Sequence, residues 1–232
     1  MPVAGPSSLP YPDPMSENTL RVTETYPSIQ GESTWAGLPC FFIRLARCNL
    51  RCAWCDTAYS FHGGHKRTIE ELVAEADAAG IPLVEITGGE PLAQFTCTHL
   101  AEALIGAGFT VLVETSGSLP IDVLPEAVIV IMDVKCPDSG MSDKNHWPNI
   151  EALRADRDEV KFVIASRRDY EWARGIVREN ALVSQCKAVL FSPVWGAVDP
   201  KNLAAWILED GLAVRLQIQM HKILWGADTK GV

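Results

Sequence analysis

Apolar runs alternate with polar or amphipathic stretches along most of the chain, and this pattern predicts strands separated by helices. The apolar runs have the length of buried strands, and several of the stretches between them are long enough for helices. The predicted strands are 20–26, 40–46, 82–87, 109–114, 128–134, 159–164, 187–192 and 213–218. The predicted helices are 68–80, 96–107, 168–180 and 200–210. Such alternation implies a parallel sheet with right-handed crossovers.

The strand and helix pattern repeats about six times, which is too few for a closed eight-stranded barrel. We therefore predict an α/β fold, a partial (open) parallel β/α barrel of about six strands. Glycine and polar residues follow several strands, for example Gly88 and Gly89 after strand 82–87. Barrels and open α/β sheets bind ligands at these carboxyl ends, so we expect the functional site there.

The composition predicts one globular core domain, residues 19–232. The chain has 232 residues, of which 47% are hydrophobic and 21% charged. No apolar run approaches the length of a membrane span, which argues against a membrane partner. The net charge of −9 and the pI of about 5.0 argue against general nucleic-acid binding.

Residues 1–18 are predicted to be a disordered tail because prolines recur along them. They lack the charged start and the apolar stretch of a signal peptide. Met15 is an alternative to Met1 as the true start of the protein.

Three of the seven cysteines, Cys48, Cys52 and Cys55, form a motif separated by three and then two residues. The other four show no ligand-like spacing: Cys40, Cys97, Cys136 and Cys186. An odd and unpatterned count argues against a disulfide framework and favours the reducing cytoplasm. Because no second cysteine cluster is visible, we expect a single metal cluster.

Three thiolates on one loop can hold one face of a metal cluster and leave one metal without a protein ligand. A closed zinc site takes four ligands, and so does a complete cubane iron–sulfur cluster. The spacing resembles that of radical S-adenosylmethionine (SAM) enzymes, in which the open iron binds the amino and carboxylate groups of SAM. The alternative is a zinc knuckle with a distant fourth ligand.

Two further features lie near the motif. Arg44 interrupts an apolar strand four residues before Cys48, and a buried arginine needs a partner. That partner is either a salt-bridging carboxylate of the protein or a substrate carboxylate bound bidentately. Gly88 and Gly89 allow a ligand to approach the backbone, and Glu90 can accept a hydrogen bond from an ammonium group. A tight turn with a solvated glutamate is the alternative.

From about residue 20 to the C-terminus, the chain resembles the 7-carboxy-7-deazaguanine synthase family of radical SAM enzymes. Eight segments carry the resemblance in order: 29–32, 42–44, 48–57, 87–91, 114–117, 133–137, 159–162 and 219–222. The resemblance implies conversion of 6-carboxy-5,6,7,8-tetrahydropterin into 7-carboxy-7-deazaguanine, with release of ammonia, in the pathway to queuosine and other 7-deazapurines. In this family a 5′-deoxyadenosyl radical takes a hydrogen from C6 of the pterin, and SAM is not consumed.

The cofactors that the resemblance implies are one [4Fe–4S] cluster, SAM and Mg²⁺. It also implies a homodimer and an external electron donor such as flavodoxin or ferredoxin. By position, the cluster ligands would be Cys48, Cys52 and Cys55, and Thr57 would be the magnesium ligand. The pterin would contact Ile29, Gln30, Gly31, Arg44 and Thr87, with His221 and the terminal carboxylate of Val232 as further candidates. SAM would contact Trp54, Cys55, Asp56, Gly89, Glu90, Ser116, Cys136, Pro137, Asp138, Ser192, Pro193, Val194 and Trp195.

The chain departs from the family pattern at Ser33 and Arg47, where relatives commonly have glycine. Both positions lie beside the expected site, so we expect the loop geometry there to be affected. Two competing functions remain at this point. One is an activase that makes a glycyl radical on a partner protein, and the other is a non-catalytic zinc or iron–sulfur module.

Overall fold

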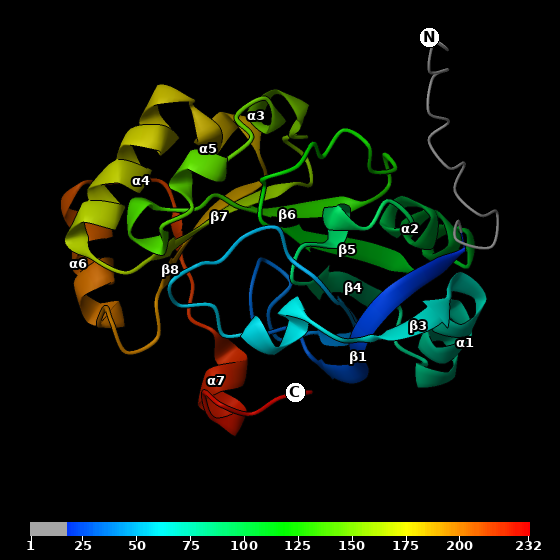
Figure 1. The fold of residues 1–232 in the computed structure, drawn as a ribbon. Helices are drawn as coiled ribbons and strands as arrows, with labels where there is room; N and C mark the ends of the chain where they lie inside the picture. Colours follow the sequence, from blue (N-terminus) through cyan, green and yellow to red (C-terminus); the bar gives the residue numbers. More distant parts are fainter. Residues whose placement is uncertain (1–17) are drawn as a thin grey trace, which may run out of the picture.

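The strands of residues 18–232, which the computed structural model describes, form one nine-stranded sheet (Figure 1). Apart from Asn18, the predicted tail 1–18, with its alternative start at Met15, lies outside the described residues. The strand order is β3-β1-β2-β4-β5-β6-β7-β8-β9. The strands are β1 (Thr19–Ile29), β2 (Pro39–Leu45), β3 (His65–Thr68), β4 (Leu83–Gly88), β5 (Thr110–Thr115), β6 (Ile129–Asp133), β7 (Glu159–Ile164), β8 (Ala188–Pro193) and β9 (Arg215–Leu216).

The sheet confirms the predicted open parallel β/α barrel. Six strands, β2 and β4 to β8, run parallel to one another. The two-residue strand β9 adds a seventh, which is shorter than the predicted strand 213–218. β1 runs antiparallel to both β2 and β3, and the sequence pattern missed β3 altogether. Because β3 and β9 are the two edges of the sheet, the barrel is open between them.

The longer helices lie in the sequence between successive parallel strands, as the alternation predicted. The helices are α1 (Ile69–Ala79), α2 (Cys97–Gly106), α3 (Asn149–Ala152), α4 (Arg167–Glu179), α5 (Leu182–Gln185), α6 (Pro200–Glu209) and α7 (Met220–Trp225). α1 begins with a complete capping box between Thr68 and Glu71 and ends at Gly80 in the left-handed conformation. The polar segment after Gln219 forms the short helix α7. None of the helices in the described residues combines the length and the apolar character that a bilayer crossing requires.

The two faces of the sheet differ in chemistry. One face packs its apolar side chains with those of the helices in the main core, for example Ile43, Ile86 and Val113. The other face lines the inside of the open barrel, which we call the lumen. A small apolar cluster forms one layer of the lumen: Cys40, Phe42, Leu83, Leu112 and Ile131.

Two residues further along each strand, the lumen side carries a charged layer. Side chains alternate between faces along a strand, so the residues two positions on from the apolar layer share its face. These residues are Arg44, Glu85, Glu114 and Asp133. The apolar layer therefore lies toward the amino ends of the strands, and the charged layer lies toward the carboxyl ends.

Both departures from the family pattern have positive backbone φ angles, 64° at Ser33 and 77° at Arg47. Glycine adopts this conformation without steric cost, whereas other L-residues are disfavoured there by about 1–2 kcal/mol. The expectation that loop geometry differs from that of relatives at these positions stays a prediction, because both backbones have a conformation that glycine favours. At both positions a residue with a side chain adopts the left-handed backbone conformation.

We predict that Arg47→Gly stabilises the protein. The substitution removes the strain at φ 77°. Glycine also increases the conformational entropy of the unfolded chain, which offsets part of this effect, so the free energy of unfolding should rise by about 0.5–1 kcal/mol. For a chain of this size, that gain corresponds to a rise in Tm of about 1–4 °C, measured by thermal unfolding. The control is Lys66→Gly, an exposed residue of β3 that is not among the described positive-φ residues. It should lower Tm, and a fall in Tm for both variants would contradict the strain argument.

Candidate active site

The cysteine loop follows β2 and packs directly against the loop that follows β4. The amide of Glu90 donates to the carbonyl of Arg47 at 2.9 Å. A Cβ at Gly89 would lie 2.1 Å from that carbonyl oxygen and 2.8 Å from Cβ of Cys48. Only glycine permits this approach, so the Gly88-Gly89-Glu90 turn fixes the start of the cysteine motif.

The three cysteines of the motif differ from the other four in exposure. Cys48, Cys52 and Cys55 are partly exposed, whereas the remaining cysteines are buried, and all seven are free thiols. Burial raises the pKa of the Cys48 and Cys52 thiols, and the charges of Cys48 and Cys55 raise the pKa of Cys52 further. The amide of Leu50 lies 3.4 Å from Sγ of Cys48 as a donor. Three accessible thiols on one loop fit the donor set of an iron–sulfur cluster.

Glu90 joins the carboxyl ends of β4 and β5. It is fully buried, and one carboxylate oxygen accepts hydrogen bonds from Oγ1 of Thr115 at 2.8 Å and from the amide of Leu92 at 3.0 Å. The other oxygen accepts from the amide of Ser116 at 2.7 Å and from its hydroxyl. The predicted SAM contacts Glu90 and Ser116 thus bond to each other. Both carboxylate oxygens of Glu90 already have protein donors.

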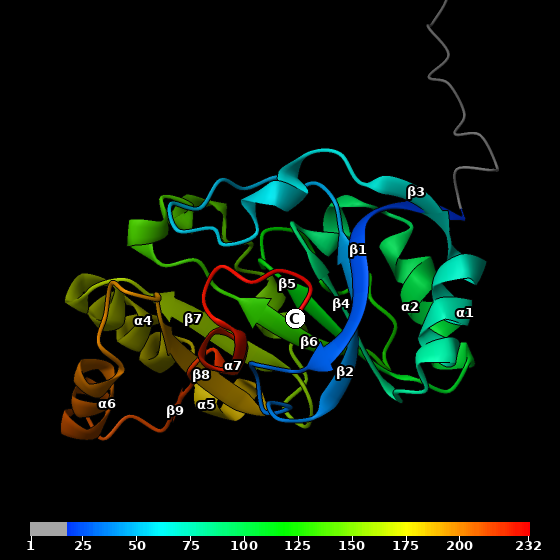
Figure 2. The same cartoon turned by 90° about the horizontal axis from the view of Figure 1, so that it is seen from below.

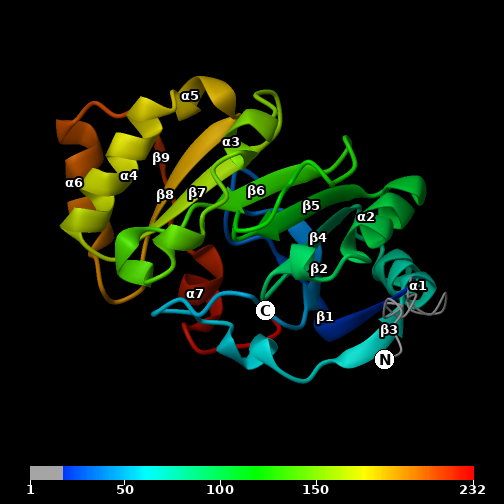
Figure 3. The same cartoon turned by 45° about the horizontal axis from the view of Figure 1, so that its top comes forward.

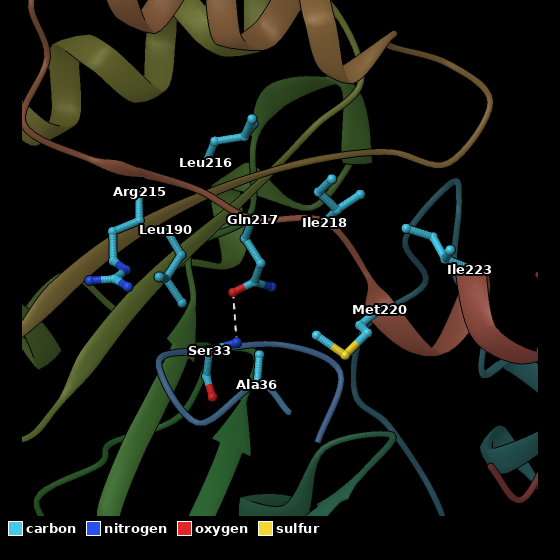
Figure 4. Close-up of a pocket in the computed structure, with 9 residues that line it drawn as sticks. All are labelled: Ser33, Ala36, Leu190, Arg215, Leu216, Gln217, Ile218, Met220 and Ile223. Atoms are coloured by element: carbon cyan, nitrogen blue, oxygen red, sulfur yellow. Dashed lines mark hydrogen bonds between the residues drawn. The ribbon is translucent and has the colours of Figure 1, made fainter. Parts of the chain in front are cut away.

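The loop between β1 and β2, residues 30–38, crosses the open side of the barrel. Gln30 is almost fully buried; its side chain donates to Glu85 and accepts from the amide of Glu32 at 2.8 Å. The amide of Thr34 donates to Glu159 of β7 at 2.9 Å, and the amide of Ser33 donates to Gln217 at 2.6 Å (Figure 4). The first and last parts of the barrel are therefore joined by this loop.

Gly31 and His221, both predicted substrate contacts, lie against each other although 190 positions separate them. A Cβ at Gly31 would lie 2.4 Å from Nδ1 of His221. The carbonyl of Gly31 also accepts a hydrogen bond from the amide of Met220 at 3.0 Å. The loop 30–38 thus fixes the start of α7. Burial lowers the pKa of His221, while the Glu32 charge acts in the opposite direction.

Lys161 of β7 is the centre of a buried network in the lumen. Its Nζ donates to Glu32 at 2.8 Å and to Glu114, and it lies 4.0 Å from Oδ2 of Asp133. Glu114 also accepts from Oγ1 of Thr87 at 3.2 Å. This network places Thr87, a predicted substrate contact, in the charged layer.

The same network sets the protonation of the carboxylates around it. Burial alone would raise the pKa of Glu32, but the charge of Lys161 and hydrogen bonds from Lys161 and Gln219 lower it to about 2. Burial and the charges of Glu114 and Glu32 raise the pKa of Glu85 well above its usual range. Lys161 therefore holds Glu32 ionised, whereas Glu85 favours its neutral form.

Arg44 has the salt-bridging partner that a buried arginine needs. Its Nε donates to Glu24 and its Nη2 donates to the hydroxyl of Tyr26, each at 2.8 Å. Glu24 also accepts from the hydroxyl of Tyr59 at 2.7 Å, and Nζ of Lys230 lies 4.4 Å from the centre of the Tyr59 ring. The C-terminal segment thus reaches the surroundings of Arg44, and the C-terminus lies in front of the sheet in Figure 2.

Asp56 and Thr57 follow the last cysteine of the motif and make different contacts. Asp56 accepts from Nζ of Lys222 in α7 at 2.7 Å. The hydroxyl of Thr57 makes no capping bond to the following 3₁₀ turn and lies 3.7 Å from Sγ of Cys55. The Thr57 hydroxyl is therefore not committed to the local turn.

The other predicted SAM contacts lie in the segment after β6 and at the carboxyl end of β8. The amide of Ala53 donates to the carbonyl of Ser139 at 3.0 Å, so segment 136–139 touches the cysteine loop. Within it Cys136 is buried, and Asp138 pairs with Arg168 at 3.0 Å. The end of β8 lines a cavity of about 550 Å³. The predicted SAM contacts Pro193, Val194 and Trp195 contribute to its wall, and so does Gln219. Ser192 is buried, whereas Trp195 is half-exposed.

Sequence reasoning missed several residues that organise the site. Lys161, Glu32 and Glu114 lie in segments that carried the family resemblance but received no role. The same holds for Lys222 in segment 219–222, whereas Glu85 was not singled out at all. The signal for Glu85 and Lys161 was present, because a charged residue inside an apolar strand needs a buried partner.

Comparisons with known proteins agree with this geometry. Residues 42–138 match the family model of the Radical SAM superfamily. A 7-carboxy-7-deazaguanine synthase of Koribacter versatilis is 46% identical over 92% of this chain and 100% of that protein. The synthase of Chlorobaculum tepidum is 41% identical over 94% of this chain and 99% of that protein. The crystal structure of QueE from Escherichia coli has the same fold, with a TM-score of 0.68 at 21% identity over 88% of this chain and 95% of that one.

We predict that Lys161→Met strongly destabilises the protein. The Lys161 side chain is only 5% exposed, so its removal leaves buried carboxylates without their cation, at a cost of about 3–5 kcal/mol. In the wild type, the ionised Glu32 carboxylate contributes to the free energy of unfolding above its usual pKa of 4.5, and this contribution is lost as the pH falls toward about 2. The free-energy difference between the two proteins, measured by denaturant unfolding, should therefore shrink over that pH range.

The control for this prediction is Lys144→Met. Lys144 pairs with Asp143 at 2.8 Å, but both side chains are more than half exposed. Water already screens such a pair, so its loss should change stability little at any pH. Equal effects of the two substitutions would show that the buried network does not depend on Lys161.

Proposed function

The chain belongs to the 7-carboxy-7-deazaguanine synthase family of radical SAM enzymes, and we propose which residues serve that family's reaction. The reaction converts 6-carboxy-5,6,7,8-tetrahydropterin into 7-carboxy-7-deazaguanine with loss of ammonia, in the pathway to queuosine and other 7-deazapurines. The observation that carries this function is 46% identity along 92% of the chain to a named synthase. Neither a glycyl-radical activase nor a zinc module accounts for a likeness of that extent.

Cys48, Cys52 and Cys55 would hold a single [4Fe–4S] cluster, and SAM would bind beside it. When bound, the cluster and SAM supply the electron and the radical that start the reaction. The support for this assignment is the exposure of the three thiols and the contact of the start of their loop, at Arg47 and Cys48, with the Gly88-Gly89-Glu90 turn. In this proposal the backbone of the turn contacts SAM, because the Glu90 carboxylate is committed to Ser116, Thr115 and Leu92.

The SAM site also takes in Trp54, Asp56 and Ser116, the segment 136–138 and the strand end 192–195. Two observations support this arrangement. The segment after β6 touches the cysteine loop through Ala53, and the strand end after β8 lines a cavity. These residues come from the carboxyl ends of different strands, which is where such folds bind ligands.

The pterin occupies the charged layer of the lumen in this proposal. Arg44 binds the substrate carboxylate with the part of its guanidinium group that Glu24 and Tyr26 leave free. Gln30 retains one amide N–H after its bond to Glu85, and Gly31 with His221 forms the adjoining wall. Thr87, Ile29 and the carboxylate of Val232 complete the contacts. Support comes from the long-range contacts that bring these segments together.

Thr57 is proposed as the protein ligand of Mg²⁺. A neutral hydroxyl suits a cation that otherwise keeps waters and substrate oxygens. Its hydroxyl makes no capping bond, and its contact with Sγ of Cys55 at 3.7 Å leaves oxygen lone pairs for a metal. The enzyme is further proposed to work as a homodimer in the cytoplasm and to receive its electron from a donor such as flavodoxin or ferredoxin. The seven free thiols support a reducing compartment.

The cluster assignment is tested with Cys52→Ala. After anaerobic reconstitution with iron and sulfide, this variant should lose the brown chromophore and all formation of 5′-deoxyadenosine and product. Each thiolate is one of only three protein ligands, so its loss opens the cluster. The control is Cys97→Ala, which changes a buried thiol in the main core and should keep both signals. Full activity in Cys52→Ala would refute the assignment.

The magnesium assignment is tested with Thr57→Ala. Cluster content and SAM binding should remain, because the hydroxyl is not a cluster ligand in this proposal. Stimulation by Mg²⁺ should shrink, and SAM cleavage should become uncoupled from product formation. Turnover is measured against Mg²⁺ concentration for both proteins. Two superimposable curves would mean that Thr57 does not bind the metal.

A further inference from the structure

The short helix α7 is held by contacts with two different loops. Its start is joined to the loop 30–38, through the amide of Met220 to Gly31 at 3.0 Å and Nε2 of Gln219 to Glu32 at 2.8 Å. The third contact is the ion pair between Nζ of Lys222 and Oδ2 of Asp56, at 2.7 Å. Figures 1 and 3 show α7 beside the loop that carries the cysteines.

The ion pair has the features of a specific contact rather than of a chance surface pairing. The side chain of Lys222 is only 9% exposed, whereas that of Asp56 is 47% exposed. A buried ammonium group without a partner would be strongly unfavourable, so the position of Lys222 depends on an acceptor. Asp56 provides that acceptor from a segment 166 positions earlier in the chain.

The two ends of this pair lie next to residues with separate roles in the proposed reaction. Asp56 lies between Cys55 and Thr57, so it belongs to the segment proposed to hold the cluster and Mg²⁺. Lys222 directly follows His221, whose ring contacts Gly31 at the pterin site. A displacement of α7 would therefore change the distance between the substrate and the groups that act on it.

We propose that Lys222 is a positioning residue, which through Asp56 fixes α7 and His221 relative to the Cys55–Thr57 segment. This inference rests on the proposed function, because it concerns the alignment of substrate with cluster and metal. In this proposal Lys222 acts only through its ion pair with Asp56. Its expected effect is on coupling: a misplaced substrate lets SAM cleavage proceed without product, because hydrogen abstraction depends on close geometry.

The test compares Lys222→Met, Lys222→Arg and the exposed-pair control Lys144→Met. Hydrogen–deuterium exchange of residues 219–226 is measured before reconstitution, with α4 as an internal reference. Lys222→Met should speed exchange in α7 alone, because the helix loses one of its two attachments. Lys222→Arg keeps the charge and should restore protection, and Lys144→Met should not change it.

The same proteins are then reconstituted and assayed for 5′-deoxyadenosine and product. Lys222→Met should keep its cluster content, raise the amount of 5′-deoxyadenosine per product severalfold, and lower product turnover by about tenfold or more. Lys222→Arg should return both values toward wild type. If Lys222→Met does not fold, Asp56→Asn removes the charge from the other side and is judged by the exchange of α7 alone, because Asp56 is also placed in the SAM site.

Three outcomes would overturn the proposal. Unchanged exchange in α7 would mean that the ion pair does not hold the helix. Faster exchange with an unchanged ratio of 5′-deoxyadenosine to product would mean that α7 does not position the substrate. Failure of Lys222→Arg to rescue would mean that the charge is not what matters. A wild-type enzyme that makes no product would refute the proposed function instead, and exchange in α7 would still report on the ion pair.

Discussion

The buried ammonium group of Lys161 is the constraint on which the interior of the barrel depends. A cation inside a protein is tolerated only when carboxylates and hydrogen-bond acceptors replace the water that it loses. Lys161 obtains them from Glu32 on the loop after β1 and from Glu114 on β5. Those carboxylates need donors in turn, and Gln217, Gln219 and Thr87 provide them. One charge on β7 therefore fixes segments from both halves of the chain.

This requirement explains how an open barrel keeps a defined interior. The edge strands β3 and β9 do not pair, so no ladder of backbone hydrogen bonds closes the sheet. The loop 30–38 crosses the opening instead, with side-chain and backbone contacts to Glu159, Gln217 and Met220. Polar contacts are directional, so they set the position of the loop more narrowly than apolar packing would. The residues expected to bind the pterin lie on or beside these contacts.

Most of the fold could be predicted from local patterns, because it depends on neighbouring residues. Strand 159–164 was predicted with its observed bounds, and the cap at Thr68 and the stop at Gly80 follow from short-range chemistry. β3 was missed because His65 to Thr68 has no apolar alternation; it forms by pairing with β1. The predicted strand 213–218 is observed as two residues, Arg215 and Leu216, which pair with Leu190 and Phe191 of β8.

The pairings within the site could not be predicted for a related reason. Glu90 bonds to Thr115, Arg44 to Glu24 and Asp56 to Lys222, over separations of 25, 20 and 166 positions, and no local pattern encodes such distances. The resemblance to a family named candidate site residues, but it did not say which of their side chains are committed to other parts of the protein. The structure adds that Glu90 and Gln30 are largely engaged inside the fold, whereas the hydroxyl of Thr57 makes no capping bond and lies 3.7 Å from Sγ of Cys55.

Because several carboxylates share the single ammonium group of Lys161, the stability of the protein depends on pH. Glu32 is held ionised, so its contribution to stability is present above pH 4.5 and is lost as the pH falls toward about 2. Burial and the neighbouring charges of Glu114 and Glu32 raise the pKa of Glu85, so it binds a proton more tightly in the folded protein. Its contribution is complete below its usual pKa of 4.5 and declines as the pH rises toward the raised value. These two glutamates therefore favour opposite ends of the pH scale, because Lys161 can neutralise only part of the charge that the lumen carries.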